Sequence, residues 1–362
     1  MTTSDKIETT DEVCEYLQIP YEQLRAPLQR LQAASVAHGN SPHADLMRMD
    51  VCHRIRLAQD RVFAAGTDPV PEYARVISDA AAQLESSSKL PLADSVMPPD
   101  DSETPQDATA NHYGALWGGF SPDHYFDEAT ALLRARLERN GFDLAKVSGM
   151  RVLDGGCGGG RYSVALKRLG FGEVVGVDWS KQGIAVANER VKQAKIAGVS
   201  YQQADVLKLP FADGEFDFVF SNGVLHHTYD TQRGIAELRR VTKPGGAGWL
   251  YLYHRPGGLD RLTHYVARLL LKRANKEVCR RYCNALGLAA NRIFFLLDLW
   301  LTPIAECYTP DEMSAMMKEA GFTSWRRCAR GADQDLAEHI YQREPFAEAK
   351  YGVGENRYFI DA

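Results

Sequence analysis

The chain has 362 residues, 45% hydrophobic and 25% charged, a composition typical of a globular protein and a length that allows two or three domains. Its net charge of −5 gives no electrostatic reason to expect nucleic acid or an anionic membrane surface as a partner. No apolar run reaches the roughly 18 residues that span a bilayer, and the polar N-terminus lacks a signal-peptide pattern. The seven cysteines lack CxxC pairing, so we expect no disulfide framework, no metal site and a cytoplasmic location.

Three regions of the chain differ in composition. Apolar residues spaced three and four apart predict helices up to residue 85, so residues 1–85 are expected to form an N-terminal helical domain. Residues 86–110 contain serines, prolines and acids but few large apolar side chains. They are predicted to be a linker, because they cannot bury enough surface to offset the entropy of ordering. From residue 111 to 362, short β-rich runs alternate with amphipathic helices, which predicts an α/β domain.

The α/β region is predicted to contain five parallel strands, at 150–154, 173–178, 199–205, 216–222 and 248–254. Residues 244–246, Pro-Gly-Gly, are expected to stop the chain before the fifth strand. Beyond it the alternation is interrupted, and residues 255–308 are predicted to be a helical insert, a pair of helices over one mouth of the sheet. Thr309 and Glu312 then have the pattern of a capping box, and Gly321 ends the helix that they begin.

A buried strand that runs directly into glycines gives the strongest functional signal, in the segment VLDGGCGGG. It contains Asp154, Gly155, Gly156 and Gly158. Glycines let the backbone turn sharply and approach a ligand closely, but dinucleotide enzymes use such a turn too. Asp154 helps to decide, because an acid at the strand end would repel a pyrophosphate. The same acid can bind the ammonium group of a ligand that carries an amino acid.

Two further acids follow at the ends of the next two strands. Asp178 can accept hydrogen bonds from both hydroxyls of a ribose. Such acids also cap helices, and Ser180 is an alternative cap for the helix that follows. Asp205, followed by Val206, ends the third strand, where a carboxylate can accept from the exocyclic amine of adenine.

Together with the segment FDFVFSNGVLHH, these features resemble the class I S-adenosylmethionine-dependent methyltransferases over residues 150–254. Asp154, Gly156, Gly158 and Gly160 match the family's acid-x-Gly-x-Gly-x-Gly motif. The resemblance implies a Rossmann-like, seven-stranded, doubly wound sheet whose last strands form an antiparallel hairpin around 322–330 and 356–360. It also implies S-adenosylmethionine as the cofactor.

The resemblance places the methionine moiety near Gly156, the ribose at Asp178 and the adenine at Asp205 and Val206. In related enzymes the segment before the first strand folds over the cofactor, and aromatic faces favour a sulfonium cation. Packing of those aromatics against the sheet is the alternative. The predicted cofactor residues are Tyr113, Trp117, Phe120, Asp154, Gly155, Gly156, Gly158, Asp178, Trp179, Asp205, Val206 and Ser221.

His226 and His227 follow the fourth strand, at the edge where ligands bind in such sheets. Either could take a proton from a nucleophile, with His227 the preferred base and a structural role the alternative. A tight turn after Lys350 could return Glu355 or Arg357 towards the pocket or a neighbouring subunit. The residues predicted to bind a cationic acceptor are Glu306, Tyr308, Asp335 and Glu338, although a solvated helix start also explains the last two.

We therefore expect a methyltransferase that acts on a small molecule in natural-product biosynthesis. A free amino acid such as arginine is the preferred acceptor, and sugars, phenols and prenyl compounds are alternatives. A dinucleotide oxidoreductase and a non-methylating protein that binds S-adenosylmethionine are the competing classes. A small helical unit on a loose linker needs something to pack against, so residues 1–85 are expected to form a homodimer interface or to cap the pocket.

Overall fold

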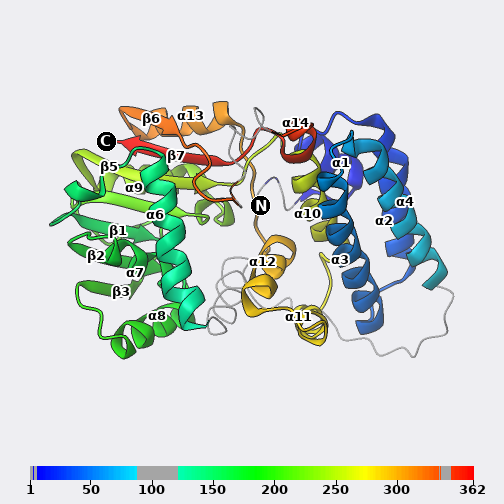
Figure 1. Ribbon diagram of the computed structural model, residues 1–362, viewed down its shortest axis with the longest axis horizontal. Helices are drawn as coiled ribbons and strands as arrows, with labels where there is room; N and C mark the ends of the chain where they lie inside the picture. The colour runs from blue at the N-terminus through cyan, green and yellow to red at the C-terminus, as the bar shows by residue number, and fades with distance from the viewer. Residues whose placement is uncertain (1–2, 4–5, 88–120, 334, 336–343) are drawn as a thin grey trace.

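The computed structural model describes residues 3, 6–87, 121–333, 335 and 344–362. Figure 1 shows two halves side by side, an α/β half built on a seven-stranded sheet and a helical half. Among the described residues, no helix is both long enough and apolar enough to cross a membrane.

The sheet has the strand order β3-β2-β1-β4-β5-β7-β6. Neighbouring strands are parallel from β3 to β5, whereas β7 runs antiparallel to both β5 and β6. This confirms the predicted seven-stranded sheet with an antiparallel last pair. The strands are β1 (Arg151–Gly155), β2 (Glu173–Asp178), β3 (Val199–Gln203), β4 (Phe216–Asn222), β5 (Thr242–Leu252), β6 (Ser324–Arg327) and β7 (Asn356–Asp361).

Two strands, β2 and β4, have the predicted bounds, while β5 differs from the prediction. It begins at Thr242 and continues through residues 244–246, so the expected stop before the strand is wrong. The pairing between β4 and β5 shifts register between Phe216 and Phe218, where the glycines of β5 form an irregular stretch. A β-bulge takes up extra residues without ending the strand, which explains the difference.

Helices cover both faces of the sheet, because successive strand residues point to opposite sides. In β1, Val152 packs with residues of α6 and α7, whereas Leu153 packs with residues of α9 and α13. The capping box of α13 is confirmed, with Thr309 accepting from the Glu312 N–H and the Glu312 carboxylate accepting from the Thr309 N–H. The helices of this half are α6 (Ala129–Arg139), α7 (Arg161–Arg168), α8 (Lys181–Gln193), α9 (Thr231–Val241) and α13 (Pro310–Ala320).

The helical half combines the N-terminal helices with those that follow β5. The helices are α1 (Thr10–Tyr16), α2 (Arg25–Ala37), α3 (Pro42–Ala64), α4 (Pro69–Ser87), α10 (Gly258–Leu270), α11 (Lys276–Ala285), α12 (Ala290–Leu301) and the short α14 (Ala347–Tyr351). The segment expected to hold a pair of helices therefore holds three, because a turn after Ala285 separates α11 from α12.

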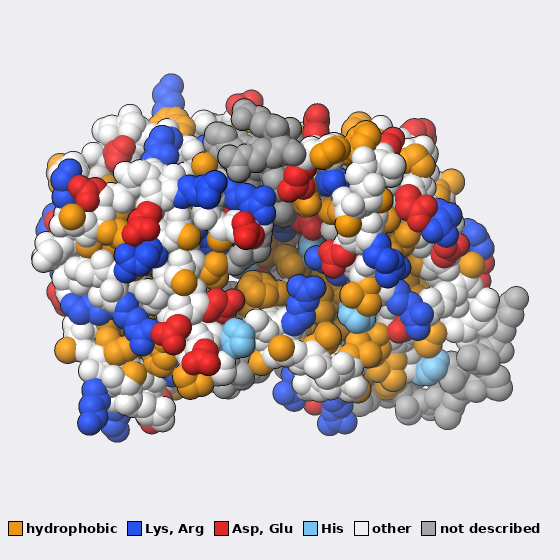
Figure 2. Space-filling view, in the orientation of Figure 1, with side chains coloured by type: hydrophobic (Ala, Val, Ile, Leu, Met, Phe, Trp, Pro, Cys, Tyr) orange, Lys and Arg blue, Asp and Glu red, His pale blue; other side chains and the backbone are white. Residues whose placement is uncertain are grey.

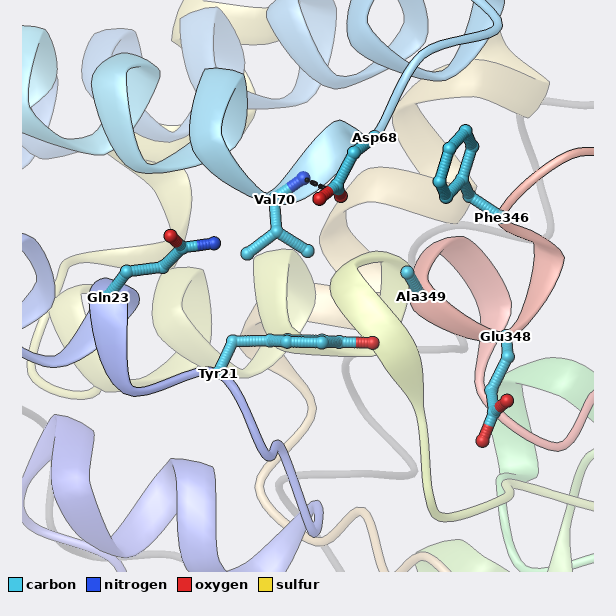
Figure 3. A pocket seen from close by; sticks show the side chains of 7 residues that line it. All are labelled: Tyr21, Gln23, Asp68, Val70, Phe346, Glu348 and Ala349. Carbon is cyan, nitrogen blue, oxygen red and sulfur yellow. Dashed lines mark hydrogen bonds between the residues drawn. The ribbon is translucent and has the colours of Figure 1, made fainter.

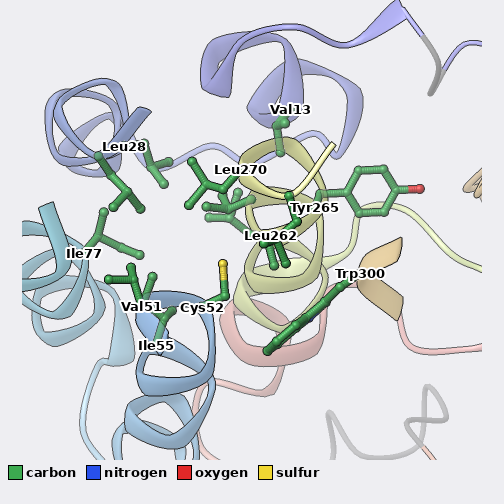
Figure 4. Packing of buried hydrophobic residues seen from close by; sticks show 14 of the residues in the cluster. Val13, Leu28, Val51, Cys52, Ile55, Ile77, Leu262, Tyr265, Leu270 and Trp300 are labelled. Carbon is green, nitrogen blue, oxygen red and sulfur yellow. The ribbon is translucent and has the colours of Figure 1, made fainter. Parts of the chain in front are cut away.

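One hydrophobic core joins the two groups of helices. Figure 4 shows Val13, Leu28 and Ile77 from the N-terminal region around Leu262 and Leu270 of α10. A hydrogen bond of 2.5 Å between the hydroxyls of Tyr73 and Thr263 and one of 2.9 Å from Gln59 to Asp260 add to this packing. The N-terminal helices thus pack against α10 within the same chain, and their expected roles as a homodimer interface or as a cap over the pocket stay predictions.

The shared core predicts the effect of truncating Leu262, whose side chain is fully buried. We expect Leu262→Ala to lower the free energy of unfolding by about 2–5 kcal/mol, because it leaves a cavity in the core. Leu286→Ala, at a position 45% exposed, is the control and should change it by less than about 0.5 kcal/mol. Urea denaturation followed by circular dichroism measures both. A wild-type unfolding free energy for Leu262→Ala would contradict the shared core.

Candidate active site

A cavity of about 530 Å³ lies between the C-terminal edge of the sheet and the helical half. Figure 2 shows the molecule hollowed between its two halves, with hydrophobic side chains inside the hollow. The ends of β1, β2 and β4 contribute Asp154, Asp178 and Asn222 to the wall, and α10 and α12 contribute Arg261 and Asp298. The volume is typical of small-molecule sites, and the carboxyl ends of parallel strands are where doubly wound sheets bind ligands.

The glycine turn after β1 forms part of this wall. Gly156 has a left-handed backbone with φ of 83°, and a Cβ added there would lie 2.2 Å from Cγ1 of Val224. The N–H groups of Gly156 and Cys157 donate to the carbonyl of Val177 at 2.8 and 2.9 Å, which ties the turn to β2. Glycine at this position is therefore required both by the backbone and by the lack of space.

Asp154 is the acid at the end of β1, and it is buried with 2% of its surface exposed. Its carboxylate accepts a hydrogen bond of 2.5 Å from the Ser163 hydroxyl. Burial raises the pKa of Asp154 to about 7, despite that hydrogen bond, and the charge of Asp178 adds to the effect. A buried carboxylate with a raised pKa gains most from a cationic ligand, which favours its charged form.

Asp178 holds the glycine turn from the neighbouring strand. It accepts hydrogen bonds of 2.8 Å from the N–H of Gly158 and 2.8 Å from the N–H of Ser180. Burial raises its pKa. Ser180, the alternative cap in the sequence analysis, is the N-cap of α8 and accepts from the N–H of Gly183. Asp178 is thereby left to face the cavity instead of capping the helix.

The structure places seven of the predicted cofactor residues on the cavity wall, namely Asp154, Gly156, Gly158, Asp178, Trp179, Asp205 and Val206. Gly155 and Ser221 are not among the residues that line it, and the Ser221 side chain is fully buried. Asp205 uses one carboxylate oxygen to accept from the Leu207 N–H at 2.9 Å. Tyr113, Trp117 and Phe120 lie outside the described residues, so their proposed contact with the cofactor stays a prediction.

The two histidines differ in what they face. His227 lines the cavity, whereas His226 is fully buried and stacks on Tyr253 with ring centroids 3.7 Å apart. The Nδ1 of His227 is 2.6 Å from the Ile304 carbonyl, and Nε2 is 3.8 Å from the Asp298 carboxylate. A carbonyl only accepts, so Nδ1 carries the hydrogen and Nε2 keeps a lone pair. Burial lowers the pKa of His227, although Asp298 opposes the shift.

The residues predicted to bind the acceptor are not gathered at one place. Glu306 accepts from the Tyr16 hydroxyl at 3.1 Å, and the Tyr308 hydroxyl is 2.8 Å from that of Thr231. Neither Glu306 nor Tyr308 lines the cavity, whereas Asp335 does. Glu338 lies outside the described residues.

Asp335 is already paired by two arginines, at 2.7 Å from Arg136 and 2.9 Å from Arg357. Burial alone would raise the pKa of Asp335, but these two cations hold it well below its usual range. Arg357 also pairs with Glu355 at 3.1 Å, and both line the cavity, as the turn after Lys350 suggested. Sequence reasoning missed Arg136 and Arg261, since nothing in the local patterns of their helices marks them as cavity residues.

A second hollow of about 330 Å³ lies where the start of α4 meets α14. Figure 3 shows Tyr21, Val70 and Ala349 among its lining residues. Its Asp68 accepts from the Val70 N–H at 3.0 Å and so serves the first turn of α4. The hollow is formed by the helical half and lacks the glycine turn and strand ends that mark the main cavity.

Comparison with known proteins adds an independent finding. Residues 153–250 match the family model described as "Methyltransferase domain". The chain is 32% identical over 162 residues to 27-O-demethylrifamycin SV methyltransferase of Amycolatopsis mediterranei, covering 42% of this chain and 60% of that relative. It is 30% identical over 172 residues to the O-methyltransferase cnsE of Penicillium expansum, covering 46% and 62%. The chain thus spans less than two thirds of the length of these two relatives.

The solved structures to which the chain is similar match it at low sequence identity. One is phosphoethanolamine N-methyltransferase 2 of Haemonchus contortus in complex with S-adenosyl-L-methionine, with 20% identity, a TM-score of 0.43, and coverage of 73% of this chain and 60% of that one. Another is an S-adenosylmethionine-dependent methyltransferase from Mesorhizobium loti, with 20% identity, a TM-score of 0.40, and coverage of 60% and 93%.

The glycine turn generates a prediction with a matched control. Gly156 and Gly149 both have φ of 83°, but a Cβ at Gly149 would meet no atom within 4 Å. Gly149→Ala should cost only the backbone strain, about 1–2 kcal/mol. Gly156→Ala should cost about 1–3 kcal/mol more, because its methyl group overlaps Val224. Thermal and urea unfolding compare the two, and equal losses would show that the turn can relax around a side chain.

Proposed function

The α/β domain of this chain belongs to the class I S-adenosylmethionine-dependent methyltransferase family, and from that premise we propose that the chain transfers a methyl group from S-adenosylmethionine to a small-molecule acceptor. The observation that carries the proposal is the meeting of the glycine turn, Asp154 and Asp178 on one cavity wall at the C-terminal edge of the sheet. The helical half closes the other side of the same cavity.

The residues on this wall fit the cofactor. Gly156 lacks a Cβ, which would overlap Val224 on the same wall, and Asp154 is a buried acid that accepts a hydrogen bond from the neutral hydroxyl of Ser163. We propose that Asp154 binds the ammonium group of the methionine moiety, that Asp178 accepts from the ribose hydroxyls, and that the adenine lies by Trp179, Asp205 and Val206. When bound, S-adenosylmethionine supplies a methyl group on a sulfonium, which a nucleophile displaces in line.

We propose that His227 is the base that takes a proton from the acceptor. Its tautomer is set by the Ile304 carbonyl, so that the lone pair lies on Nε2, and burial lowers its pKa, which favours the neutral form. Asp298, 3.8 Å from Nε2, would stabilise the charge that forms when Nε2 accepts a proton. His226 does not line the cavity, so we assign it a packing role against Tyr253.

The acceptor is proposed to be small, because one cavity of about 530 Å³ must hold it together with the cofactor. A free amino acid remains our preferred class. The preference does not extend to arginine in particular, since Asp335, the acid expected to select a guanidinium, is already paired with Arg136 and Arg357. A role in natural-product biosynthesis is in keeping with relatives such as the rifamycin methyltransferase.

A label-transfer screen tests the proposal. The protein would be incubated with methyl-labelled S-adenosylmethionine and a panel of amino acids, sugars, phenols and prenyl compounds, and the products would be analysed by mass spectrometry. A labelled product is expected. S-adenosylhomocysteine binding without any labelled product would instead favour the non-methylating class, and tighter binding of NAD would favour the oxidoreductase class.

The raised pKa of Asp154 predicts a pH dependence of cofactor binding. Only the ionised carboxylate attracts an ammonium group, and with a pKa of about 7 its ionised fraction falls as the pH decreases through that value. S-adenosylhomocysteine should therefore bind about tenfold more weakly at pH 6 than at pH 8. Asp154→Asn should bind about 10- to 100-fold more weakly and lose this pH dependence. Asp213→Asn, whose side chain is 83% exposed, is the control, and calorimetry measures all three.

The proposed base predicts the pH profile of turnover. His227→Ala should lower kcat by about 10²- to 10⁴-fold and leave the affinity for S-adenosylhomocysteine unchanged. In the wild type, kcat should decrease with falling pH only below the ordinary titration range of histidine, because burial lowers the pKa of His227. Asp298→Asn should move this limb to lower pH, since Asp298 raises the pKa of His227. An unchanged kcat in His227→Ala would show that His227 is not the base.

A further inference from the structure

Arg261, in the first turn of α10, is a buried cation on the cavity wall. It is 4% exposed, and its guanidinium carbon lies 4.2 Å from the centre of the Tyr253 ring. Among the described residues, its Nε has no hydrogen-bond partner and its guanidinium has no ion pair. Arginine keeps its proton in proteins, and a buried charge without a partner is costly. The cavity side of Arg261 therefore favours a ligand that supplies an anion.

The carboxylates near Arg261 form their close contacts with other residues. Arg136 and Arg357 share Asp335 between them, and Arg357 also pairs with Glu355. Asp260, next to Arg261 in sequence, accepts a hydrogen bond from Gln59 at 2.9 Å and lies 3.9 Å from His264. Among the described residues of the cavity wall, Arg261 is a buried cation without a carboxylate oxygen within 4.0 Å, although Asp260 and Glu355 act on it electrostatically at longer range.

The position of Arg261 relates it to the proposed chemistry. Tyr253 lies between Arg261 and the proposed base, with its ring centroid 5.3 Å from that of His227. The Tyr253 hydroxyl is 3.5 Å from the carboxylate of Asp298, the partner of His227. A ligand group bound at Arg261 is therefore within the length of a small molecule of a nucleophile at His227.

We propose that Arg261 is the subsite for an oxyanion carried by the acceptor, a carboxylate or a phosphate ester, and this inference rests on the proposed function. The planar guanidinium can donate two parallel hydrogen bonds to such a group. The α-carboxylate of an amino acid meets the requirement, whereas neutral sugars, phenols and prenyl alcohols do not. Binding the anion at α10 leaves the opposite end of the acceptor directed towards Tyr253 and His227.

The test measures anion binding without turnover, so that it does not depend on the identity of the acceptor. Benzoate, phenyl phosphate and neutral benzamide would each be titrated by calorimetry into the full-length protein, with and without S-adenosylhomocysteine. We expect saturable binding of benzoate or phenyl phosphate and at least about tenfold weaker binding of benzamide. The stronger of the two anions identifies whether a carboxylate or a phosphate is preferred.

Variants then locate the site. Arg261→Gln should weaken anion binding at least about tenfold, and Arg261→Lys should retain part of it, because an ammonium keeps the charge but not the planar pair of donors. Arg273→Gln removes the same charge from an exposed arginine just after α10 and should bind as the wild type does. Unchanged affinity for S-adenosylhomocysteine in Arg261→Gln would show that the fold is intact.

The outcomes separate this inference from the proposed function. Equal binding of benzoate and benzamide, no binding of either anion, or anion binding that Arg261→Gln leaves unchanged would overturn the oxyanion subsite. Methyl transfer to a neutral acceptor at the same rate in wild type and Arg261→Gln would also overturn it, while leaving the methyltransferase proposal in place. Arg261-dependent anion binding together with no methyl transfer would support the subsite and count against the methyltransferase.

Discussion

The packing of α10 in the core of the helical half is the interaction on which the rest of the structure depends. This helix contacts α1 and α3 from the N-terminal region and α12 and α14 from later in the chain. Its apolar residues, such as Leu262 and Leu270, lie in the core that these helices share, while Arg261 and His264 of the same helix line the cavity. Since the core fixes α10 and α10 supplies part of the cavity wall, the N-terminal helices support the site through α10, and α3 adds Arg56 to the wall.

Burial also sets the electrostatics of the site. Desolvation disfavours charge, so it raises the pKa of Asp154 to about 7, where the carboxyl is about half ionised at pH 7, and it lowers the pKa of His227. Asp335 behaves differently, because Arg136 and Arg357 stabilise its charged form at distances below 3 Å. Asp154 and His227 are therefore the groups whose charge a bound ligand can change. The ion pairs of Asp335 with Arg136 and Arg357 instead stabilise the cavity wall.

Local signals explain how much of the structure could be predicted from the sequence. The capping box of Thr309 and Glu312 is complete within four residues, and the glycine turn follows its strand directly. The pairing of Arg136 with Asp335 joins residues 199 positions apart, and the Tyr73–Thr263 hydrogen bond joins residues 190 apart. No local pattern states which apolar or charged faces will meet over such distances. For this reason the prediction that acids select the acceptor did not take into account the two arginines that pair with Asp335.

Asp154 and Arg261 lie on different parts of the cavity wall, and their opposite charges bear on how two ligands can share it. The strand ends present Asp154, Asp178 and Asp205, and α10 presents Arg261. A cofactor with its ammonium group at the sheet and an acceptor with its anion at α10 satisfies both walls. The reverse arrangement would place an ammonium group beside Arg261 and an anion beside Asp154, and like charges that meet away from water are costly. In the proposed arrangement the cofactor lies at the sheet, the acceptor lies at α10, and Tyr253 and His227 lie where the two would meet.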